Sequence, residues 1–558
     1  MRRGLLYSRP LVPNSPRREF ALVLLGFAAL TVTLTFPLAF HLSSLTYNLV
    51  NNDSQFSIWN VAWVARTLVI NPLHVFDANI FYPHRWTLAY SEANLGAGAL
   101  ASPLYWLTGN VYVAHNFVVL LSFVMSGTGA YYLARYLVND RGAAVVSGVA
   151  FAYCPHVVAH FPHIQVLMTA GLPASLLAFH RMADRPSARR GGVLGLAMAV
   201  QAYFCGYYAV FAMLLVGFAV LFIATSRGLW RERSYWTAVA VAAAVAIAAV
   251  SPLAGVYAMI QHTTGFSRSV EASGSFFANW SSYLTSSSYA HTWMWAFIPK
   301  GSDQSFPGFV TLVFGVFALG SALSGPASGR RWRELVLLYS AIAVLACWES
   351  FGPRAGLYRL TYAVVPGFSF LRVPARFGLL VALSFSVLGA IGLAQLFARL
   401  PRPMLVAVPL ALLAAAELAV PLRLTPTPEP EPAYAQLAKL PYGPLLELPV
   451  YSEKFAFLRS RYMLGSTNHW MPLVDSYSDY IPADFLEKMD VLGEFPTRES
   501  LAQLERDHVR YALVHVGAYT DGPMRAALFD RVKAFTPYLR VAYADNDTQL
   551  YEITGSPR

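Results

Sequence analysis

Long apolar runs recur along the chain as far as residue 421. They lie near residues 20–40, 111–138, 143–160, 164–181, 191–206, 207–225, 236–260, 307–324, 333–349, 377–398 and 403–421. An apolar stretch of about 20 residues is long enough to cross a bilayer as an α-helix. The pattern therefore predicts about eleven membrane-spanning helices. Between residues 191 and 225, the stretch "FCGYY" predicts either a short turn or only a kink.

Basic residues gather at the ends of these runs. Arg2, Arg3, Arg17 and Arg18 precede the first run, and "HRMADRPSARR", "SRGLWRER", "GRRWR" and "ARLPRP" follow the fourth, sixth, eighth and tenth. Loops rich in Lys and Arg stay on the cytoplasmic side of a membrane. All five clusters fall on that side if the N-terminus is cytoplasmic. The odd number of helices then places the C-terminus outside, with three long external segments at 41–110, 261–306 and 350–376.

The pattern changes after the stretch "TPTPEPEP", which predicts a stiff connector. Residues 433–558 contain apolar runs of strand length in "GPLLELPV", "VRYALVHV", "LRVAYAD" and "TQLYEIT". The segments "RESLAQLERDH" and "GPMRAALFDRVKAF" have the spacing of amphipathic helices. The sequence thus predicts a membrane domain at 1–425 and an extracytoplasmic α/β domain at 433–558.

Composition supports a polytopic α-helical membrane protein. The 558 residues are 56% hydrophobic and 13% charged, whereas soluble proteins carry about 25% charged residues. The net charge of +11 could indicate nucleic-acid binding, but the arginines lie at the ends of spans, as topology signals do. We therefore expect membrane lipids, and no nucleic acid, as partners. Cys154, Cys205 and Cys347 have no metal or redox spacing and predict buried apolar positions.

The first external segment opens with an acid beside several aromatic residues, in "NLVNNDSQFSIWNVAW". Apolar residues such as Phe56, Trp59 and Trp63 recur at helical spacing, which predicts a helix lying in the plane of the lipid headgroups. Asp53 stands at the start of this helix and is predicted to cap it. A carboxylate at a helix N-terminus also stays ionised, so Asp53 can serve as a base.

The stretch that follows, "FDANIFYPHRWTLAYSEANLG", contains Tyr82-Pro83, His84, Arg85 and Glu92. A span, an external acid on a juxtamembrane helix, a Tyr-Pro segment, a second acid and a second span occur in this order. The arrangement resembles the first external loop of the GT-C superfamily, the integral membrane glycosyltransferases that use polyprenyl-phosphate sugars. The resemblance implies that Asp53 is the catalytic base and that Glu92 is a weaker second acid.

One departure and two further matches bear on this resemblance. Several GT-C members carry two adjacent acids where this chain has Asn51 and Asn52, so a metal is not expected, although a divalent cation stays open as a cofactor. The stretch "FSFLRVPARFGLL" resembles a segment of bacterial GT-C-like and YfhO-like membrane proteins. The stretch "LGSTNHWMPLVDSYSDYIP" resembles the exported domain of the same proteins.

Transfer from a lipid phosphate needs a base for the acceptor hydroxyl and cations for the departing phosphate. Arg372 and Arg376 are the first candidates for the phosphate, with Lys300 and Arg85 behind them, and Tyr82 and His84 lie beside Arg85. The alternative is that the two arginines only anchor a helix at the headgroups.

"AYCPHVVAHFPHIQ" places His156, His160 and His163 at i, i+4 and i+7, but Pro162 is expected to take His163 off the shared face. Substrate hydrogen bonding, polar packing and zinc binding all stay open for the three histidines.

The resulting hypothesis is an inverting GT-C glycosyltransferase of the bacterial inner membrane. It would move a sugar from a polyprenyl-phosphate donor to an extracytoplasmic glycan, lipid or protein acceptor. A transporter or flippase is one alternative, but the spans are almost free of ionisable residues and show no inverted repeat. A non-catalytic envelope assembly protein is the other, since the C-terminal segment has neither a nucleophile elbow nor a phosphate loop.

Overall fold

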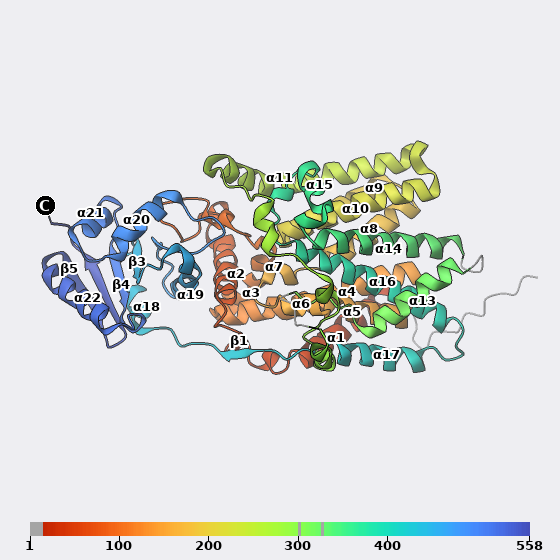
Figure 1. The fold of residues 1–558 in the computed structure, drawn as a ribbon, viewed down its shortest axis with the longest axis horizontal. Coiled ribbons are helices and arrows are strands. Elements are labelled where there is room, and N and C mark those ends of the chain that lie inside the picture. The colour runs from red at the N-terminus through yellow and green to blue at the C-terminus, as the bar shows by residue number, and fades with distance from the viewer. Residues whose placement is uncertain (1–14, 299–302, 325–328, 558) are drawn as a thin grey trace, which may run out of the picture.

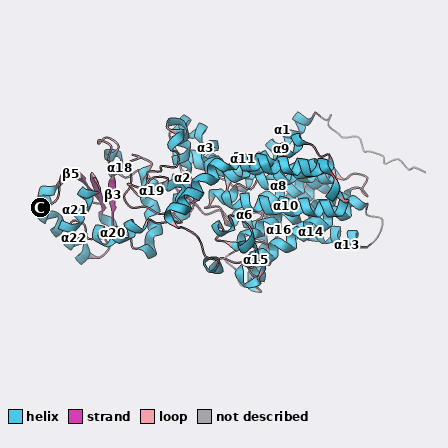
Figure 2. Ribbon diagram, turned by 90° about the horizontal axis from the view of Figure 1, so that it is seen from above, coloured by secondary structure: helices cyan, strands magenta, loops and turns pink. Residues whose placement is uncertain are grey.

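The computed structural model describes residues 15–298, 303–324 and 329–557. Figure 1 shows a bundle of long helices at one end and a small domain with a sheet at the other. Helices α2 (Asn52–Ile70) and α3 (Leu95–Thr108) lie between the two parts (Figures 1 and 2). The bundle is built from the segments that the sequence predicts to span the membrane.

Each predicted apolar run contains at least one helix of the bundle. These helices are α1 (Pro16–Leu34), α4 (Val111–Val138), α5 (Arg141–Ala152), α6 (Pro155–Ala159), α7 (Ile164–Leu167), α8 (Gly171–Asp184), α9 (Ala188–Phe204), α10 (Gly206–Arg227), α11 (Arg233–Thr264), α13 (Phe309–Leu323), α14 (Arg330–Ser350), α16 (Gly378–Phe397) and α17 (Met404–Glu417). In the part of the chain that the structure describes, six helical segments are long and apolar enough to cross a membrane. They are Val111–Val138, Arg141–Ala159, Ile164–Asp184, Gly206–Arg227, Arg233–Thr264 and Pro374–Phe397.

The centre of the bundle is helix α16, which is buried along almost its whole length, whereas α11 lies on the outside. Helix α11 packs on α9 through small residues. At Gly191 and Gly195, an added Cβ would collide with the backbone oxygens of Ala238 and Ala242. Such small-residue contacts let two membrane helices approach closely.

Three predicted runs are interrupted in ways that shape the site. Pro155 starts a new helix because it lacks the N–H that a helix interior requires, so the run at 143–160 becomes α5 and α6. The run at 164–181 likewise divides into α7 and α8. Between α9 and α10, Cys205 is extended, with φ −161° and ψ 117°, which makes "FCGYY" a turn. Helix α10 therefore returns to the end of the bundle where α8 ends, and Arg227 lies 2.9 Å from Asp184 there.

The two ends of the bundle differ in their charges. At the end farthest from the small domain, Arg227 also pairs with Glu334, at 2.6 Å. Glu19 near the start of α1 pairs with Arg135 and Arg141 at the same end. The predicted Arg-rich loops that follow α8 and α10 and precede α14 thus meet at one end, and the three long segments lie at the other. Arg2 and Arg3 lie outside the described residues. These segments contain β1 (Leu45–Tyr47), α2, α3, α12 (Trp280–Tyr283) and α15 (Leu357–Val364).

The predicted contact of the α2 tryptophans with lipid headgroups is wrong, because these side chains pack against protein. Trp59 is fully buried and Trp63 is 7% exposed. The Trp63 indole donates to the carbonyl oxygen of Val75, and its ring lies 5.8 Å from that of Trp470 in the C-terminal part. An apolar, Trp-rich helix face can be buried against protein as well as against lipid. Here α3, α4 and α19 (Ser460–Ser466) supply the protein surface that covers α2.

The C-terminal domain (residues 433–557) contains the four predicted strands. They are β3 (Leu445–Leu448), β4 (Tyr511–His515), β5 (Leu539–Ala544) and β6 (Thr548–Ile553), in the order β3-β4-β6-β5. β3 and β4 are parallel and the other pairs are antiparallel. Both predicted helices are present, as α21 (Arg498–Arg506) and α22 (Gly522–Ala534), beside α18 (Pro432–Leu437), α19 and α20 (Ala483–Gly493).

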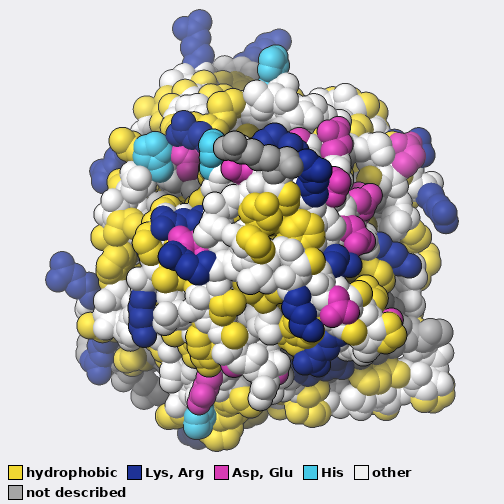
Figure 3. Space-filling view, turned by 90° about the vertical axis from the view of Figure 1, so that its left-hand side faces the viewer, with side chains coloured by type: hydrophobic (Ala, Val, Ile, Leu, Met, Phe, Trp, Pro, Cys, Tyr) yellow, Lys and Arg dark blue, Asp and Glu magenta, His cyan; other side chains and the backbone are white. Residues whose placement is uncertain are grey.

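The outer surface of this domain carries no concentrated charge of one sign. Figure 3 shows Lys and Arg side chains interspersed with Asp, Glu and apolar side chains on its end face. The net charge of +11 is therefore not gathered there as a surface for a polyanion.

The connector between the two parts is held by both. Its strand β2 (Leu424–Pro426) pairs antiparallel with β1, so that Leu45 faces Pro426. At its far end, Glu431 lies 3.2 Å from His515, which also bonds the fully buried Glu447 at 2.7 Å. Burial alone would lower the pKa of His515, but the bonds to Glu431 and Glu447 raise that pKa to about 9. A charged imidazole thus links the connector to the sheet.

Candidate active site

Asp53 lies in the first turn of α2, with its side chain 45% exposed. The sequence predicted that Asp53 caps this helix, and that prediction is wrong. The cap is Asn51, whose side chain accepts from the Asp53 N–H at 2.8 Å. The Asp53 carboxylate is therefore free for another contact, and its Oδ2 lies 3.3 Å from Nε2 of His163. The hydrogen bond with His163 lowers the pKa of Asp53 in spite of burial, and Arg376 and Arg372 lower it further. Asp53 is consequently an ionised, accessible carboxylate.

The three histidines form a row that ends at Asp53. The His156 and His160 ring centroids are 4.7 Å apart, and those of His160 and His163 are 6.1 Å apart. The Pro162 turn, which was predicted to remove His163 from the row, instead brings it to Asp53. Nδ1 of His160 donates to the backbone oxygen of His156, which fixes the orientation of the His160 ring. At the other end, fully buried His156 contacts Ser305 at 3.3 Å and leaves its Nε2 without a hydrogen-bond partner.

Arg376 is the most unusual cation of the site. It stands just before α16 and is 8% exposed, with its guanidinium 4.4 Å from the ring centroid of Tyr207. Its Nε has no hydrogen-bond partner, and within the described ranges no carboxylate forms an ion pair with it. A buried, unpaired charge costs several kcal/mol. Arg376 is therefore arranged to receive an anion.

Arg372 lies four residues earlier and is 43% exposed. Its guanidinium is 4.5 Å from the Phe276 ring centroid, and its Nη1 is 3.6 Å from Asp479 of the C-terminal domain. Because Arg372 lowers the pKa of Asp53 together with Arg376, both predicted phosphate ligands are close to the predicted base. Arg376 is buried, and the Arg372 guanidinium lies against Phe276 and Asp479.

Glu92 belongs to the same region but has a different environment. Its Oε1 accepts the N–H of Gly206, the first residue of α10, at 2.9 Å. Its backbone oxygen accepts from Asn60 on α2. Burial raises the pKa of Glu92, although the Gly206 N–H and Arg376 act in the opposite direction. The structure thus brings Glu92 near the base and shows it holding α2 to the start of α10.

The other predicted ligands lie elsewhere or are not described. Arg85 pairs with Asp77 at 3.0 Å, and His84 pairs with Asp484 at 2.9 Å. The backbone N–H of Tyr82 donates to Leu473 in the C-terminal domain. Tyr82 and His84 thus connect the first long segment to that domain, whereas Arg85 bonds within its own segment. Lys300 lies outside the described residues.

Two charged residues of the site carried no predicted role. Asp479 pairs with Arg268 at 3.1 Å and with Arg372 at 3.6 Å, and it accepts from Ser91 at 2.8 Å. Asp479 lies in the stretch "VDSYSDYIP". By sequence this stretch belongs to the exported domain, and none of its residues is predicted to belong to the site. Arg268 is a single cation in a long segment, and no spacing in the sequence distinguishes it.

The residues around Asp53 do not fit a divalent cation. Asn51 is used as the helix cap, and Asn52 lies against Ser460. Arg376 and Arg372 are close enough to lower the pKa of Asp53, and their positive charges repel a metal ion. Among the described residues, no group of three or more His, Cys, Asp or Glu is arranged to hold a metal.

Replacing His163 by Gln should shift the acid limb of the pH–rate profile to higher pH. Asp53 must be ionised to act as a base, and its pKa is lowered first by His163. Without this bond the Asp53 pKa rises toward its ordinary value, so activity is lost at a less acidic pH. The measurement is kcat/KM against pH. His74→Gln is the matched control, because His74 bonds another acid of the same segment, Asp77. An unmoved acid limb in His163→Gln would contradict this pairing.

The fold of this chain resembles that of solved membrane glycosyltransferases, although its sequence matches no family. No family model matches the sequence, and no curated protein matches it. The structure resembles the arabinofuranosyltransferase AftD from Mycobacteria with a TM-score of 0.54 at 15% identity. The alignment covers 98% of this chain and 40% of that chain, so this chain spans less than half of AftD.

Two further solved structures align at lower TM-scores. ArnT from Cupriavidus metallidurans, bound to undecaprenyl phosphate, has a TM-score of 0.44 at 13% identity, over 96% of this chain and 99% of that one. The oligosaccharyltransferase AglB from Archaeoglobus fulgidus has a TM-score of 0.44 at 10% identity, over 94% and 72%. The likeness to AftD shows the fold alone, and it agrees with the GT-C-like membrane fold predicted from the sequence.

Proposed function

We propose that this protein is an inverting glycosyltransferase that moves a sugar from a polyprenyl-phosphate donor to an acceptor hydroxyl, with Asp53 as the general base. The site would face the outer side of the bacterial inner membrane, as the distribution of arginines predicts. The observation that carries the proposal is the juxtaposition of buried, unpaired Arg376 with the ionised carboxylate of Asp53.

The cationic side of the site suits a phosphate monoester or diester. Arg376 and Arg372 offer planar forks of N–H donors, which match phosphate oxygens better than a single ammonium does. His156 lies close enough to Arg376 for their charges to interact, and its Nε2 has no hydrogen-bond partner. This nitrogen is a further polar atom for a phosphate. An anion bound here would relieve the cost of burying the Arg376 charge.

The reaction then follows as a single displacement. The acceptor oxygen forms a bond to the anomeric carbon while the bond from that carbon to the phosphate oxygen breaks. Asp53 takes the hydroxyl proton, and the polyprenyl phosphate leaves with the bonding electrons. Arg376 and Arg372 stabilise the charge that develops on the leaving oxygen. His163 holds the carboxylate in position.

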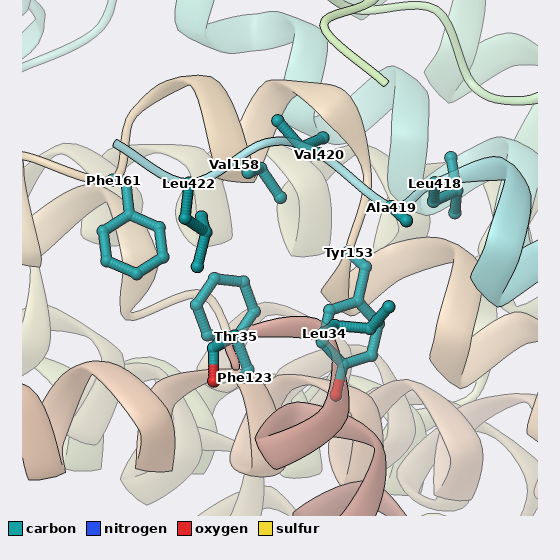
Figure 4. A pocket seen from close by; sticks show the side chains of 10 residues that line it. All are labelled: Leu34, Thr35, Phe123, Tyr153, Val158, Phe161, Leu418, Ala419, Val420 and Leu422. Carbon is teal, nitrogen blue, oxygen red and sulfur yellow. The ribbon is translucent and has the colours of Figure 1, made fainter. Parts of the chain in front are cut away.

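Two adjoining apolar clefts lie near the segment that carries the three histidines, and only the second, of about 540 Å³, has room for the lipid part of the donor. In the first cleft, Figure 4 shows Leu422 pointing toward Phe123, with Phe161 and Tyr153 on either side. Val158 and Phe161, which line this first cleft, belong to the segment that carries the three histidines. The second cleft continues past Leu34, Leu45 and Leu424. An isoprenoid chain is apolar and would be shielded from water there.

The wild-type protein in nanodiscs tests this proposal directly. Polyprenyl phosphate should raise its Tm, because a ligand that binds only the folded state stabilises it, whereas the uncharged polyprenol should not. Labelled polyprenyl-phosphate sugars should pass label to one of a panel of glycan, lipid and peptide acceptors. A protein that shows neither stabilisation nor transfer would refute the assignment as a polyprenyl-phosphate enzyme.

A further inference from the structure

One carboxylate of the C-terminal domain reaches into the proposed phosphate site. Asp479 is 31% exposed and holds two guanidinium groups, those of Arg268 and Arg372. Arg268 comes from the second long segment and Arg372 from the third, and Ser91 of the first donates to the same carboxylate. Four separate parts of the chain therefore meet at Asp479.

The segment that carries Asp479 is docked by contacts that do not need its charge. The Tyr480 N–H donates to the backbone oxygen of Tyr90, and the two rings lie 5.0 Å apart. The Tyr480 ring also faces Phe266, at 5.5 Å. The position of this segment is thus fixed by a backbone hydrogen bond and aromatic packing, which leaves the carboxylate free to serve another purpose.

The Asp479 carboxylate occupies a place that an anionic donor would need. A phosphate bound between Arg376 and Arg372 would lie close to it, and two anions repel each other. Half-exposed ion pairs such as Arg372–Asp479 are weak. Charge-assisted, two-pronged bonds from an arginine to a phosphate are considerably stronger. The incoming phosphate is therefore the better partner for Arg372.

We propose that Asp479 is a displaceable counter-ion: it holds Arg372 and Arg268 while the site is free of donor, and yields them to the lipid phosphate. This inference rests on the proposed function. It makes the C-terminal domain a determinant of how tightly the site holds donor and spent carrier lipid. By competing for the arginines, Asp479 weakens the binding of both and speeds the release of the polyprenyl phosphate product.

The test is the affinity for a short-chain polyprenyl phosphate, measured on the full chain in nanodiscs. Asp479→Asn should bind it about three- to ten-fold more tightly, since a weak competing ion pair is removed. The donor KM should fall while kcat does not rise, because the product leaves more slowly. Asn can still accept the Ser91 hydrogen bond, so the segment should stay docked. Asp479→Glu, which restores the charge, should return the affinity to the wild-type value.

Two further variants separate this effect from general ones. Asp490→Asn removes an exposed acid of the same domain, on α20, and should leave the affinity unchanged. In an Arg372→Ala background, Asp479→Asn should tighten binding much less, because one of the two competed cations is absent.

The outcomes are distinguishable. Unchanged or weaker lipid-phosphate binding in Asp479→Asn would overturn this inference alone; a raised KM for acceptor would then identify Asp479 as an acceptor contact. A wild-type protein that binds no polyprenyl phosphate would refute the proposed function itself.

Discussion

Asp53→Asn should lower the turnover of sugar transfer by about 10²–10⁴-fold, which is the usual contribution of a general base. Asn has nearly the same shape and can still accept a hydrogen bond from His163, but it cannot take the acceptor proton. The measurement is transfer of labelled sugar from a polyprenyl-phosphate donor, together with a thermal melt of the same preparation. The affinity for polyprenyl phosphate should not fall, because the substitution removes a negative charge near the two arginines.

The structure also supplies a control that separates chemistry from folding. Asn51, not Asp53, caps α2, so Asp53→Asn should leave Tm nearly unchanged. Asn51→Ala removes the cap and should cost about 1 kcal/mol of stability, while a base remains at residue 53. A well-folded Asp53→Asn protein with full turnover would exclude Asp53 as the base. Glu92 would then be the next carboxylate to test.

Arg376→Gln should reduce kcat/KM for the donor by about 10²–10³-fold, because one charge-assisted contact to the leaving phosphate is lost. Its effect on stability should have the opposite sign. Arg376 is 8% exposed and its charge has no ion-pair partner among the described residues, so a neutral side chain should raise the Tm of the ligand-free protein. If Arg376 only anchors a helix, its replacement should not lower kcat/KM for the donor while raising the Tm of the ligand-free protein.

The ligand dependence of Tm completes that test. Polyprenyl phosphate should stabilise the wild type but stabilise Arg376→Gln much less. Arg354→Gln serves as the matched control, since Arg354 is exposed in the same long segment and its guanidinium lies over the Phe277 ring. Wild-type donor kinetics in Arg376→Gln would remove Arg376 from the phosphate site.

The sequence predicted those features that depend on local pattern. Runs of apolar residues predicted the bundle helices, and short alternating runs predicted β3 to β6, because both signals repeat within a single element. Asp53, His163, Arg372 and Arg376 were selected by residue type and by resemblance, and the structure brings them together. Their catalytic roles stay a prediction.

What the sequence could not predict depends on contacts between distant segments. The Trp-rich face of α2 suits a lipid interface and a protein interface equally, and the protein surface that covers it is about 400 residues away in Trp470. Asn and Asp cap helices almost equally well, so pattern alone could not choose between Asn51 and Asp53. Asp479 lacked any signal because its partners, Arg268 and Arg372, lie in different segments.

The pairing of β1 with β2 has a consequence for the order in which the protein is completed during synthesis. Leu45 faces Pro426, so the strand that precedes α2 has no partner until the ribosome has made residue 426. Gln55 on α2 then still awaits Ser460, which bonds its side chain. The segment that holds Asp53 is therefore among the first parts to be translated and among the last to be enclosed. A nascent chain with every bundle helix already made would still lack the contact between Gln55 and Ser460.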